Sequence, residues 1–403
     1  MKRRTLLASL VVASSAGCLR LQSTDGGTTT EAEATADEQA VSSGSQTATE
    51  VAGTDEQTTD EPTTTEQTTT EAPTAAESDR LDLRWRSGIR SYEAVVEGPT
   101  MYAFPGSNGV HAVEIETGAT QWSAAPDATL RGAAVDGDAV FAADRKGDGS
   151  LYAVDTDDQS TRWTADLGGS ARPPVRASEE FAVAGSWSEG EGSRLTAFDR
   201  ETGEERWTWE HENSVGEASP VVDGTIYVGT TGAPTIHAID VQTGREQWVL
   251  EQGSEFPVIV ADGSLYCAWT SRVAKISLED RSKKWQVRLD GTIPRQPVLT
   301  DGRLFTGVDG GAVVALDVVS GEEVWRADVP FNRDSALAVG PDAVWVATQS
   351  ELHAVDRGSA EAELVGALNT SATHPQTTEA VFHDGTLVLC RGQSPMEAYD
   401  VVE

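Results

Sequence analysis

Lysine, cysteine and long apolar runs are scarce in this chain of 403 residues. Only five positions carry lysine, and 65 acidic residues outnumber 30 arginines and lysines, which gives a net charge of −35. Proteins that bind DNA or RNA present a basic face to the phosphates. The composition therefore argues against a nucleic-acid partner. No nucleophile elbow, phosphate-binding loop or catalytic-triad motif is found in the sequence either.

The acidic charge extends along the whole chain. Residues 19–79 hold 14 acids against one arginine, and residues 80–403 still carry a net charge of −25. Charge of this size keeps a protein soluble and lets it bind counterions, a property that halophilic proteins use. A high-salt habitat is the interpretation we favour.

Residues 1–18, MKRRTLLASLVVASSAGC, predict a twin-arginine-type lipoprotein signal. Arg3 and Arg4 resemble the arginine pair of twin-arginine export signals. The apolar run from Leu6 to Ala13 is too short to span a bilayer permanently. Small residues lead to Cys18, which we expect to be freed by cleavage and lipidated, so that an acyl chain anchors the protein. The alternative is an ordinary cleaved signal with an incidental cysteine.

Residues 19–79 predict a disordered, acidic stalk. Threonine and glutamate dominate it, as in TTDEPTTTEQTTTEAPTAAE, and it has no aromatic residue. Such a segment cannot bury enough apolar surface to offset the entropy of folding. Anchor and stalk together predict that residues 80–403 lie outside the cell, on the outer face of the membrane.

A tryptophan recurs through residues 80–403. Successive members are separated by 37, 41, 44, 41, 37 and 40 residues, and the next equivalent position is Leu364. The members are Trp85, Trp122, Trp163, Trp207, Trp248, Trp285 and Trp325. A repeat of about forty residues is typical of a β-propeller with four strands in each blade.

Each repeat also reads as four short strands. In the repeat at residues 220–250, the four strands are PVV, TIYVGT, TIHAID and EQWVL. They are rich in β-branched and aromatic residues, and the turns between them include Asp-Gly and Thr-Gly. LDLRWRS, at residues 81–87, is a fourth strand without its own blade, and the segment from about His374 to Glu403 supplies strands one to three. Joining the two ends closes the ring. The expected fold is an all-β, eight-bladed propeller over residues 80–403.

These residues resemble the PQQ-like (pyrrolo-quinoline quinone) repeat family, whose tryptophan-docking pattern is Ala-x-Asp-x-x-Thr-Gly-x-x-x-Trp. Ala112, Glu114, Thr117, Gly118 and Trp122 carry the pattern in one repeat. It recurs nearly complete at residues 197–207, 238–248 and 315–325, and decays at 153–163 and 275–285. The indole is expected to pack between neighbouring blades, with Gly leaving room for it. Stacking of ligands or single strands on a tryptophan ladder is the alternative.

The resemblance also brings quinoprotein dehydrogenases to mind. Members of that kind use a vicinal cysteine pair beside the quinone, a calcium held by Glu and Asn, and a catalytic Asp. Here Cys267 and Cys390 are single and occupy the second strands of different blades, so we expect buried thiols and no disulfide. His111, His237 and His353 occupy one repeat position in three blades, which is too far apart for a shared metal. We expect no catalytic residues, no cofactor and no metal.

One group of residues suggests binding. Five arginines lie in or beside the segments that lead into the inner strands, near one mouth of the channel, and form a possible collar for an anionic ligand or a partner's acidic tail. They are Arg90, Arg131, Arg172, Arg295 and Arg333. The alternative is that each pairs with a nearby carboxylate. The loops between strands two and three, such as residues 187–193 and 231–235, vary most and are further candidates.

Three functions follow as expectations. The first is a non-enzymatic, monomeric surface lipoprotein whose propeller binds other cell-surface or membrane proteins, as the resemblance to the family's outer-membrane assembly lipoprotein implies. The second is a quinone-dependent sugar or alcohol dehydrogenase. The third is a surface module that binds a small molecule or polysaccharide. We favour the first.

Overall fold

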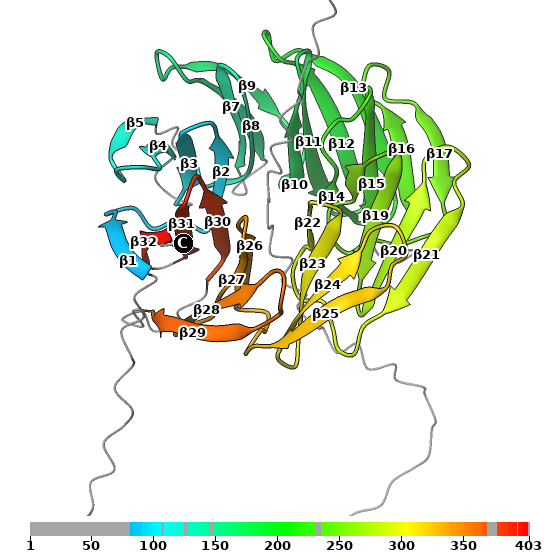
Figure 1. Ribbon diagram of the computed structural model, residues 1–403. Helices are drawn as coiled ribbons and strands as arrows, with labels where there is room; N and C mark the ends of the chain where they lie inside the picture. The colour runs from blue at the N-terminus through cyan, green and yellow to red at the C-terminus, as the bar shows by residue number, and fades with distance from the viewer. Residues whose placement is uncertain are drawn as a thin grey trace, which may run out of the picture. The chain divides into compact units, whose positions relative to one another are not determined.

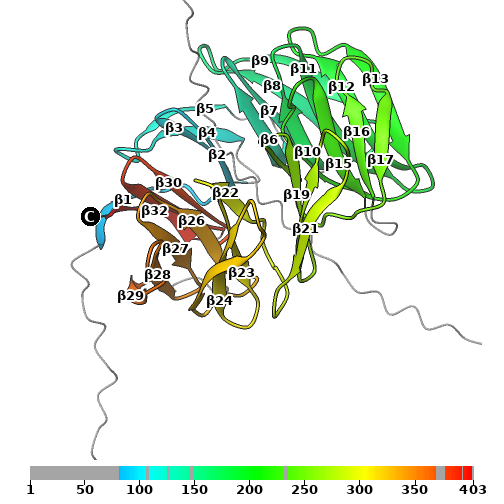
Figure 2. The same cartoon turned by 45° about the vertical axis from the view of Figure 1, so that its right-hand side comes forward.

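The computed structural model describes residues 81–105, 109–124, 128–144, 149–230, 235–368, 377–392 and 394–401. These residues form 32 β-strands and no helix, so no helix among them is long and apolar enough to cross a membrane. The strands pair in eight antiparallel four-stranded sheets, the blades of the propeller seen in Figures 1 and 2. The predicted all-β, eight-bladed architecture is confirmed.

Each blade is numbered by its place along the chain. Blade 1 consists of β2 (Glu93–Glu97), β3 (Thr100–Phe104), β4 (Val110–Glu114) and β5 (Thr120–Ala124). Blade 2 consists of β6 (Leu130–Asp136), β7 (Ala139–Asp144), β8 (Ser150–Asp155) and β9 (Thr161–Asp166). Blade 3 consists of β10 (Ser170–Ala177), β11 (Phe181–Ser188), β12 (Gly192–Asp199) and β13 (Glu205–His211). Blade 4 consists of β14 (Val215–Ala218), β15 (Thr225–Thr230), β16 (Ile236–Asp240) and β17 (Glu246–Leu250).

The second half of the chain repeats this order. Blade 5 consists of β18 (Ile259–Ala261), β19 (Ser264–Trp269), β20 (Arg272–Ser277) and β21 (Lys283–Arg288). Blade 6 consists of β22 (Val298–Thr300), β23 (Arg303–Val308), β24 (Ala312–Asp317) and β25 (Glu323–Asp328). Blade 7 consists of β26 (Ala336–Val339), β27 (Ala343–Ala347), β28 (Glu351–Asp356) and β29 (Ala362–Ala367). Blade 8 consists of β30 (Glu379–His383), β31 (Thr386–Arg391), β32 (Ser394–Val401) and β1 (Leu81–Arg86).

The two ends of the propeller sequence meet in blade 8, as predicted. β1 pairs antiparallel with β32, with Leu81 opposite Val401 and Arg86 opposite Glu397. In Figures 1 and 2 the blue β1 lies beside the red strands of the C-terminus. Closure removes a free edge on β32 that would otherwise be open to pairing with another chain.

The apolar core is divided among the joints between blades. The described residues contain eight clusters of buried apolar side chains, and each cluster draws its members from two consecutive blades. The cluster that joins blade 8 to blade 1 contains Trp85, Met101 and Met396. A blade therefore cannot bury its own flanks, and the ring is stabilised only when its neighbours are in place.

The recurring tryptophan forms these joints together with a glycine of the next blade. A Cβ built on the turn glycine would lie 2.4–2.6 Å from the indole, a distance that real Cβ atoms essentially never show. The pairs are Trp85 with Gly118, Trp163 with Gly203, Trp207 with Gly244 and Trp285 with Gly321. The indole Nε1 of each of these tryptophans also donates to a carbonyl of the same turn, as Trp85 does to Ile115 at 2.8 Å. The packing role predicted for the indoles is thus what the structure shows.

Three tryptophan joints lack this glycine, and two of them are looser. Gln159, Arg281 and Ala360 take its place with φ of 62°, 58° and 63°, the left-handed region in which glycine carries no steric cost. Opposite Ala360, Trp325 still donates to the carbonyl oxygen of Arg357 at 3.0 Å. Trp122 and Trp248, the partners of Gln159 and Arg281, are only partly buried. Within the described part of the chain, neither indole donates to the neighbouring turn. The guanidinium of Arg281 instead lies over the Trp248 ring, 5.3 Å from its centroid.

The joint between blades 7 and 8 departs from the repeat. Leu364, which stands where the spacing places a tryptophan, is 51% exposed, whereas Val365 is 2% exposed. The cause is a β-bulge at a different position. In blade 6 the register shift falls just after the motif alanine, between Ala315 and Leu316. In blade 7 it falls before the motif alanine, between Leu352 and His353. Trp345 of β27 fills the joint from the second strand.

Candidate functional site

The propeller has two unlike faces. Turns that join strands one to two and three to four lie on one side, here called the turn face. The segments that lead into each inner strand, together with the loops between strands two and three, lie on the other, here called the mouth face. Among the described residues, turn-face segments hold 17 acidic residues against four arginines, and mouth-face segments hold eight against three arginines. An acidic ligand or partner therefore meets less repulsion at the mouth face.

The five arginines of the predicted collar do not form one site. Arg295 donates to the carbonyl oxygens of Thr377 and Thr378, both at 3.3 Å, across the mouth from blade 6 to blade 8. It therefore has a structural role. The side chain of Arg131 lies outside the described part of the structure. Three exposed members remain, and they make no ion pair with any described residue: Arg90, Arg172 and Arg333.

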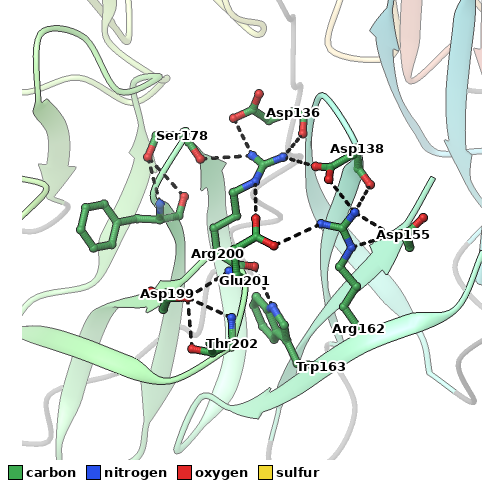
Figure 3. A network of polar contacts seen from close by, with 11 residues as sticks. Asp136, Asp138, Asp155, Arg162, Trp163, Ser178, Asp199, Arg200, Glu201 and Thr202 are labelled. Atoms are coloured by element: carbon green, nitrogen blue, oxygen red, sulfur yellow. Dashed lines mark hydrogen bonds and ion pairs between the residues drawn. The ribbon is translucent and has the colours of Figure 1, made fainter. Parts of the chain in front are cut away.

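On the turn face, by contrast, several arginines pair with carboxylates, although Arg281 packs against Trp248 instead. The buried Arg200 forms ion pairs with Asp136 and Asp138 of the preceding blade, at 2.8 and 2.6 Å (Figure 3). Arg162 forms ion pairs with Asp138 and Asp155, at 2.7 and 2.6 Å. Hydrogen bonds from Arg162 and then from Arg200 lower the pKa of Asp138 to about 2. This network ties blade 2 to blade 3.

A second network of the same kind joins blades 6 and 7. Arg357 pairs with Asp301 at 2.9 Å and donates to the carbonyl oxygens of Gly340 and Pro341. Because every carboxylate in these pairs already accepts hydrogen bonds, the networks serve the joints between blades.

The acid of the repeat also has a local role. Asp199 accepts hydrogen bonds from the backbone N–H groups of Glu201 and Thr202, at 3.0 and 2.9 Å. Its other oxygen accepts one from Arg206, and that bond, followed by the turn bonds, lowers the pKa of Asp199 to about 2. The same turn cap is formed at Asp240, Asp317 and Asp356.

Two surface depressions are shallow. One, of about 520 Å³, is lined by Glu179–Phe181, Asp199–Glu201, Arg206 and Gln242 on the turn face. The other, of about 450 Å³, is lined by Thr270, Ser271 and Arg288–Thr292 on the mouth face. The groups of the first belong to the blade 3 turn just described, so it adds no separate chemistry.

The residues present do not fit a quinone cofactor of the dehydrogenase type. Cys267 and Cys390 are buried in β19 and β31, three blades apart, and each is a single thiol. Burial raises the pKa of Cys267 to about 12 and also raises that of Cys390, with Glu379 as the second cause. Within the described residues, no three histidine, cysteine or acidic side chains come together as metal ligands.

The histidines of the repeat lie in separate blades, as predicted. His111, His237 and His353 belong to β4, β16 and β28. The sequence did not reveal that His211 of blade 3 meets His237 of blade 4, with ring centroids 4.9 Å apart. The two residues belong to different repeats, and no motif links them. The sequence therefore has no local pattern that predicts this contact.

Blade 3 carries an exposed aromatic residue at the mouth face. Trp187 is 36% exposed at the end of β11, and the guanidinium of Arg172 lies 5.9 Å from its ring centroid. The neighbouring serines fix the strand, because Ser186 and Ser188 donate to the carbonyl oxygens of Leu167 and Gly168, both at 2.8 Å. Trp187 and Arg172 thus stand on a rigid strand end.

These side chains continue outward along the seam between blades 3 and 4. In the sheet of blade 3, Ser193 lies between its cross-strand partners Trp187 and His211. The next row of cross-strand partners contains Arg172, Gly185, Leu195 and Trp209. Leu195 packs against blade 4, so both rows face that blade. Trp209 stacks on His211 with centroids 5.3 Å apart. Glycine opposite Arg172 leaves space for the guanidinium to reach the indole.

Comparisons with known proteins agree with this geometry. The curated relatives include outer membrane protein assembly factor BamB of Yersinia pestis, 25% identical over 238 residues, which are 51% of this chain and 58% of that protein. A quinohemoprotein alcohol dehydrogenase of Comamonas testosteroni is 28% identical over 135 residues, 33% of this chain and 15% of that protein. The chain thus spans less than two thirds of either relative.

The solved structures extend the comparison to the whole propeller. BamB from Moraxella catarrhalis matches with a TM-score of 0.61 and 16% identity, covering 81% of this chain and 99% of that one, which shows a shared fold. The family model described as outer membrane protein assembly factor BamB matches residues 57–187, 146–266, 191–335 and 269–400. These matches overlap from the first blade to the last, and the chain belongs to this family of PQQ-like repeat propellers.

Proposed function

We propose that the protein is a non-enzymatic scaffold of the cell envelope, whose propeller binds other proteins during their assembly. The observation that carries this proposal is the extent of the family match, which runs from residue 57 to residue 400 through all eight blades. By contrast, the matched part of the Comamonas dehydrogenase is only 15% of that enzyme. A rigid ring with varied loops on one face also suits a binding role.

The proposal includes export and a lipid anchor. Arg3 and Arg4 direct export, Cys18 carries the lipid, and residues 19–79 separate the anchor from the propeller. All of these residues lie outside the described part of the chain. The stalk joins the propeller at Leu81, whose partner Val401 places it on the acidic turn face.

A test of the scaffold function uses the full chain in native membranes. A photo-reactive amino acid is placed at exposed positions on both faces, one position for each variant, and adducts are identified by mass spectrometry. The scaffold function predicts that the same protein partners recur at adjacent positions of one face. Adducts that are absent at every position, or that scatter without a common partner, would contradict it.

A separate measurement tests the dehydrogenase alternative. The purified chain is incubated with the quinone and calcium, and absorbance and dye reduction with sugars and alcohols are recorded. We expect neither a bound-quinone spectrum nor dye reduction, because Cys267 and Cys390 are separate and buried. Substrate-dependent dye reduction would overturn the scaffold proposal in favour of an enzyme.

A further inference from the structure

We propose that Trp187 and Arg172 form the central contact of a docking site on the mouth face, and that the site receives an extended, acidic peptide segment of a partner protein. The site lies at the seam between blades 3 and 4. This inference rests on the proposed scaffold function and names the surface and the partner chemistry that the function requires.

The first argument is the exposure of the indole. Trp187 is 36% exposed, and each of the other ten tryptophans is less exposed than this. It contributes to none of the eight clusters that join the blades. An indole that stabilises no joint and remains at the surface is typical of a protein interface, where tryptophan and arginine dominate the binding energy.

The second argument is charge. Arg172 makes no ion pair with a described residue, although the chain carries 65 acidic residues. On the turn face, Arg162, Arg200, Arg206 and Arg357 all have carboxylate partners. The guanidinium of Arg172 packs over the indole instead, which leaves its N–H groups available to a carboxylate from outside.

The third argument is preorganisation. Ser186 and Ser188, on either side of Trp187, hold the strand end to the segment that leads into blade 3. β11 and β12 are eight residues long, so the hairpin extends the sheet at this face. A ligand that binds here meets a stacked pair already in place, and less conformational entropy is lost on binding.

The seam supplies further apolar surface beside the pair. Trp209, His211 and His237 form a ring cluster with centroid distances of 4.9–5.3 Å. An extended segment that places a carboxylate on Arg172 can lay an adjacent apolar side chain against Trp187 and the next one toward this cluster. The chemistry therefore favours a segment in which acidic and apolar residues alternate.

The test uses labelled twelve-residue peptide pools and the full chain. In one pool aspartate alternates with aromatic or aliphatic residues, and in the matched pool lysine replaces aspartate. We expect the aspartate pool to bind at least about tenfold more tightly by fluorescence anisotropy. Trp187→Ala is expected to weaken its binding about tenfold or more, and Arg172→Gln to weaken it and reduce its dependence on salt.

Two controls keep the test specific. Val319, 78% exposed on the turn face, provides the variant Val319→Ala, which should bind like the parent. Trp187→Phe should retain part of the affinity, and the thermal midpoint of each variant confirms folding. Equal binding of the two pools, or unchanged binding by Trp187→Ala and Arg172→Gln, would overturn the inference. So would binding of neutral glycans that Trp187→Ala abolishes and Arg172→Gln leaves intact, since that result assigns the site to carbohydrate.

Failure of the inference is distinguishable from failure of the scaffold function. With a photo-reactive group at position 187 and another at position 319, the inference predicts a protein adduct at 187 alone. Adducts elsewhere on the propeller but none at 187 would overturn the site and keep the scaffold. No adduct at any position would remove both.

Discussion

The indole of Trp85 lies against the backbone of Gly118, so that a Cβ on this glycine would stand 2.4 Å from the indole Cδ2. Trp85 belongs to the first strand in the sequence, and Gly118 belongs to the turn between β4 and β5 of blade 1. The two form the joint between blade 8 and blade 1. The contact closes the ring, and three other joints repeat it.

Gly118→Ala should therefore destabilise the propeller more than alanine at a comparable glycine away from an indole. Gly98 is the matched control, because its φ of 56° is also left-handed and a Cβ there meets nothing within 4 Å. Both variants lose the glycine conformation, and only Gly118→Ala adds overpacking, which costs about 1–3 kcal/mol. Chemical unfolding measures the difference. Equal free energies of unfolding for the two variants would refute the contact.

The arginine networks predict a second difference. Arg200→Gln removes a buried guanidinium from Asp136 and Asp138. We expect a loss of about 1–2 kcal/mol, because the backbone carbonyl oxygens of Asp136 and Ser178 lose their donor, whereas water can replace it at the exposed carboxylates. Arg326→Gln, at a surface pair with Glu323, should change the free energy of unfolding by about 0.5 kcal/mol or less. Similar losses at both positions would show that the network does not join the blades.

Stability should fall in acid. The pKa values of Asp138 and Asp199 are lowered to about 2, below the value of about 3.9 for an unfolded chain. Their contribution is fully present above pH 4 and is lost as the pH falls from about 4 to 2. Unfolding midpoints measured between pH 6 and 2 in high salt, where general repulsion among carboxylates is screened, should show this fall. Asp138→Asn should make it shallower, and a rise in midpoint would contradict the assignment.

Thiol labelling tests the burial of the cysteines and the proposed lipid on Cys18. Cys267 and Cys390 are buried and burial raises the pKa of both thiols, so an alkylating reagent should label neither in the folded protein. Unfolding should expose two thiols in protein taken from membranes, because a lipidated Cys18 cannot react. Three thiols after unfolding would show an unmodified Cys18, and fast labelling before unfolding would contradict the buried positions.

Much of the fold could be predicted because the same sequence motif recurs in most blades. Turn glycines, capping aspartates and indoles recur at fixed spacing, and the orphan strand at Leu81–Arg86 needs the C-terminal strands to complete a blade. Leu364 shows the limit of spacing alone. A shift of the bulge in β29 turned this residue outward and Val365 inward, and a bulge position is set by packing with the next blade rather than by sequence distance.

The site was less predictable for a related reason. Arg295 was grouped with the collar because it precedes an inner strand, but its partners Thr377 and Thr378 lie in blade 8, two blades along the ring. The sequence did single out the loop at residues 187–193, but the exposure of Trp187 and its contact with Arg172 depend on neighbours in other strands. Contacts between residues far apart in sequence carry no signature within one repeat.

Ring closure by β1 is the central claim, and truncation tests it most directly. A chain that begins at residue 80 keeps β1, whereas one that begins at residue 88 lacks β1, Trp85 and the ion pairs of Arg84 with Asp400 and of Arg86 with Glu397. Thermal unfolding and size-exclusion chromatography of the two chains should show one cooperative, monomeric transition for the longer chain, and a much lower midpoint with self-association for the shorter. Identical midpoints and a monomeric shorter chain would contradict closure by this strand.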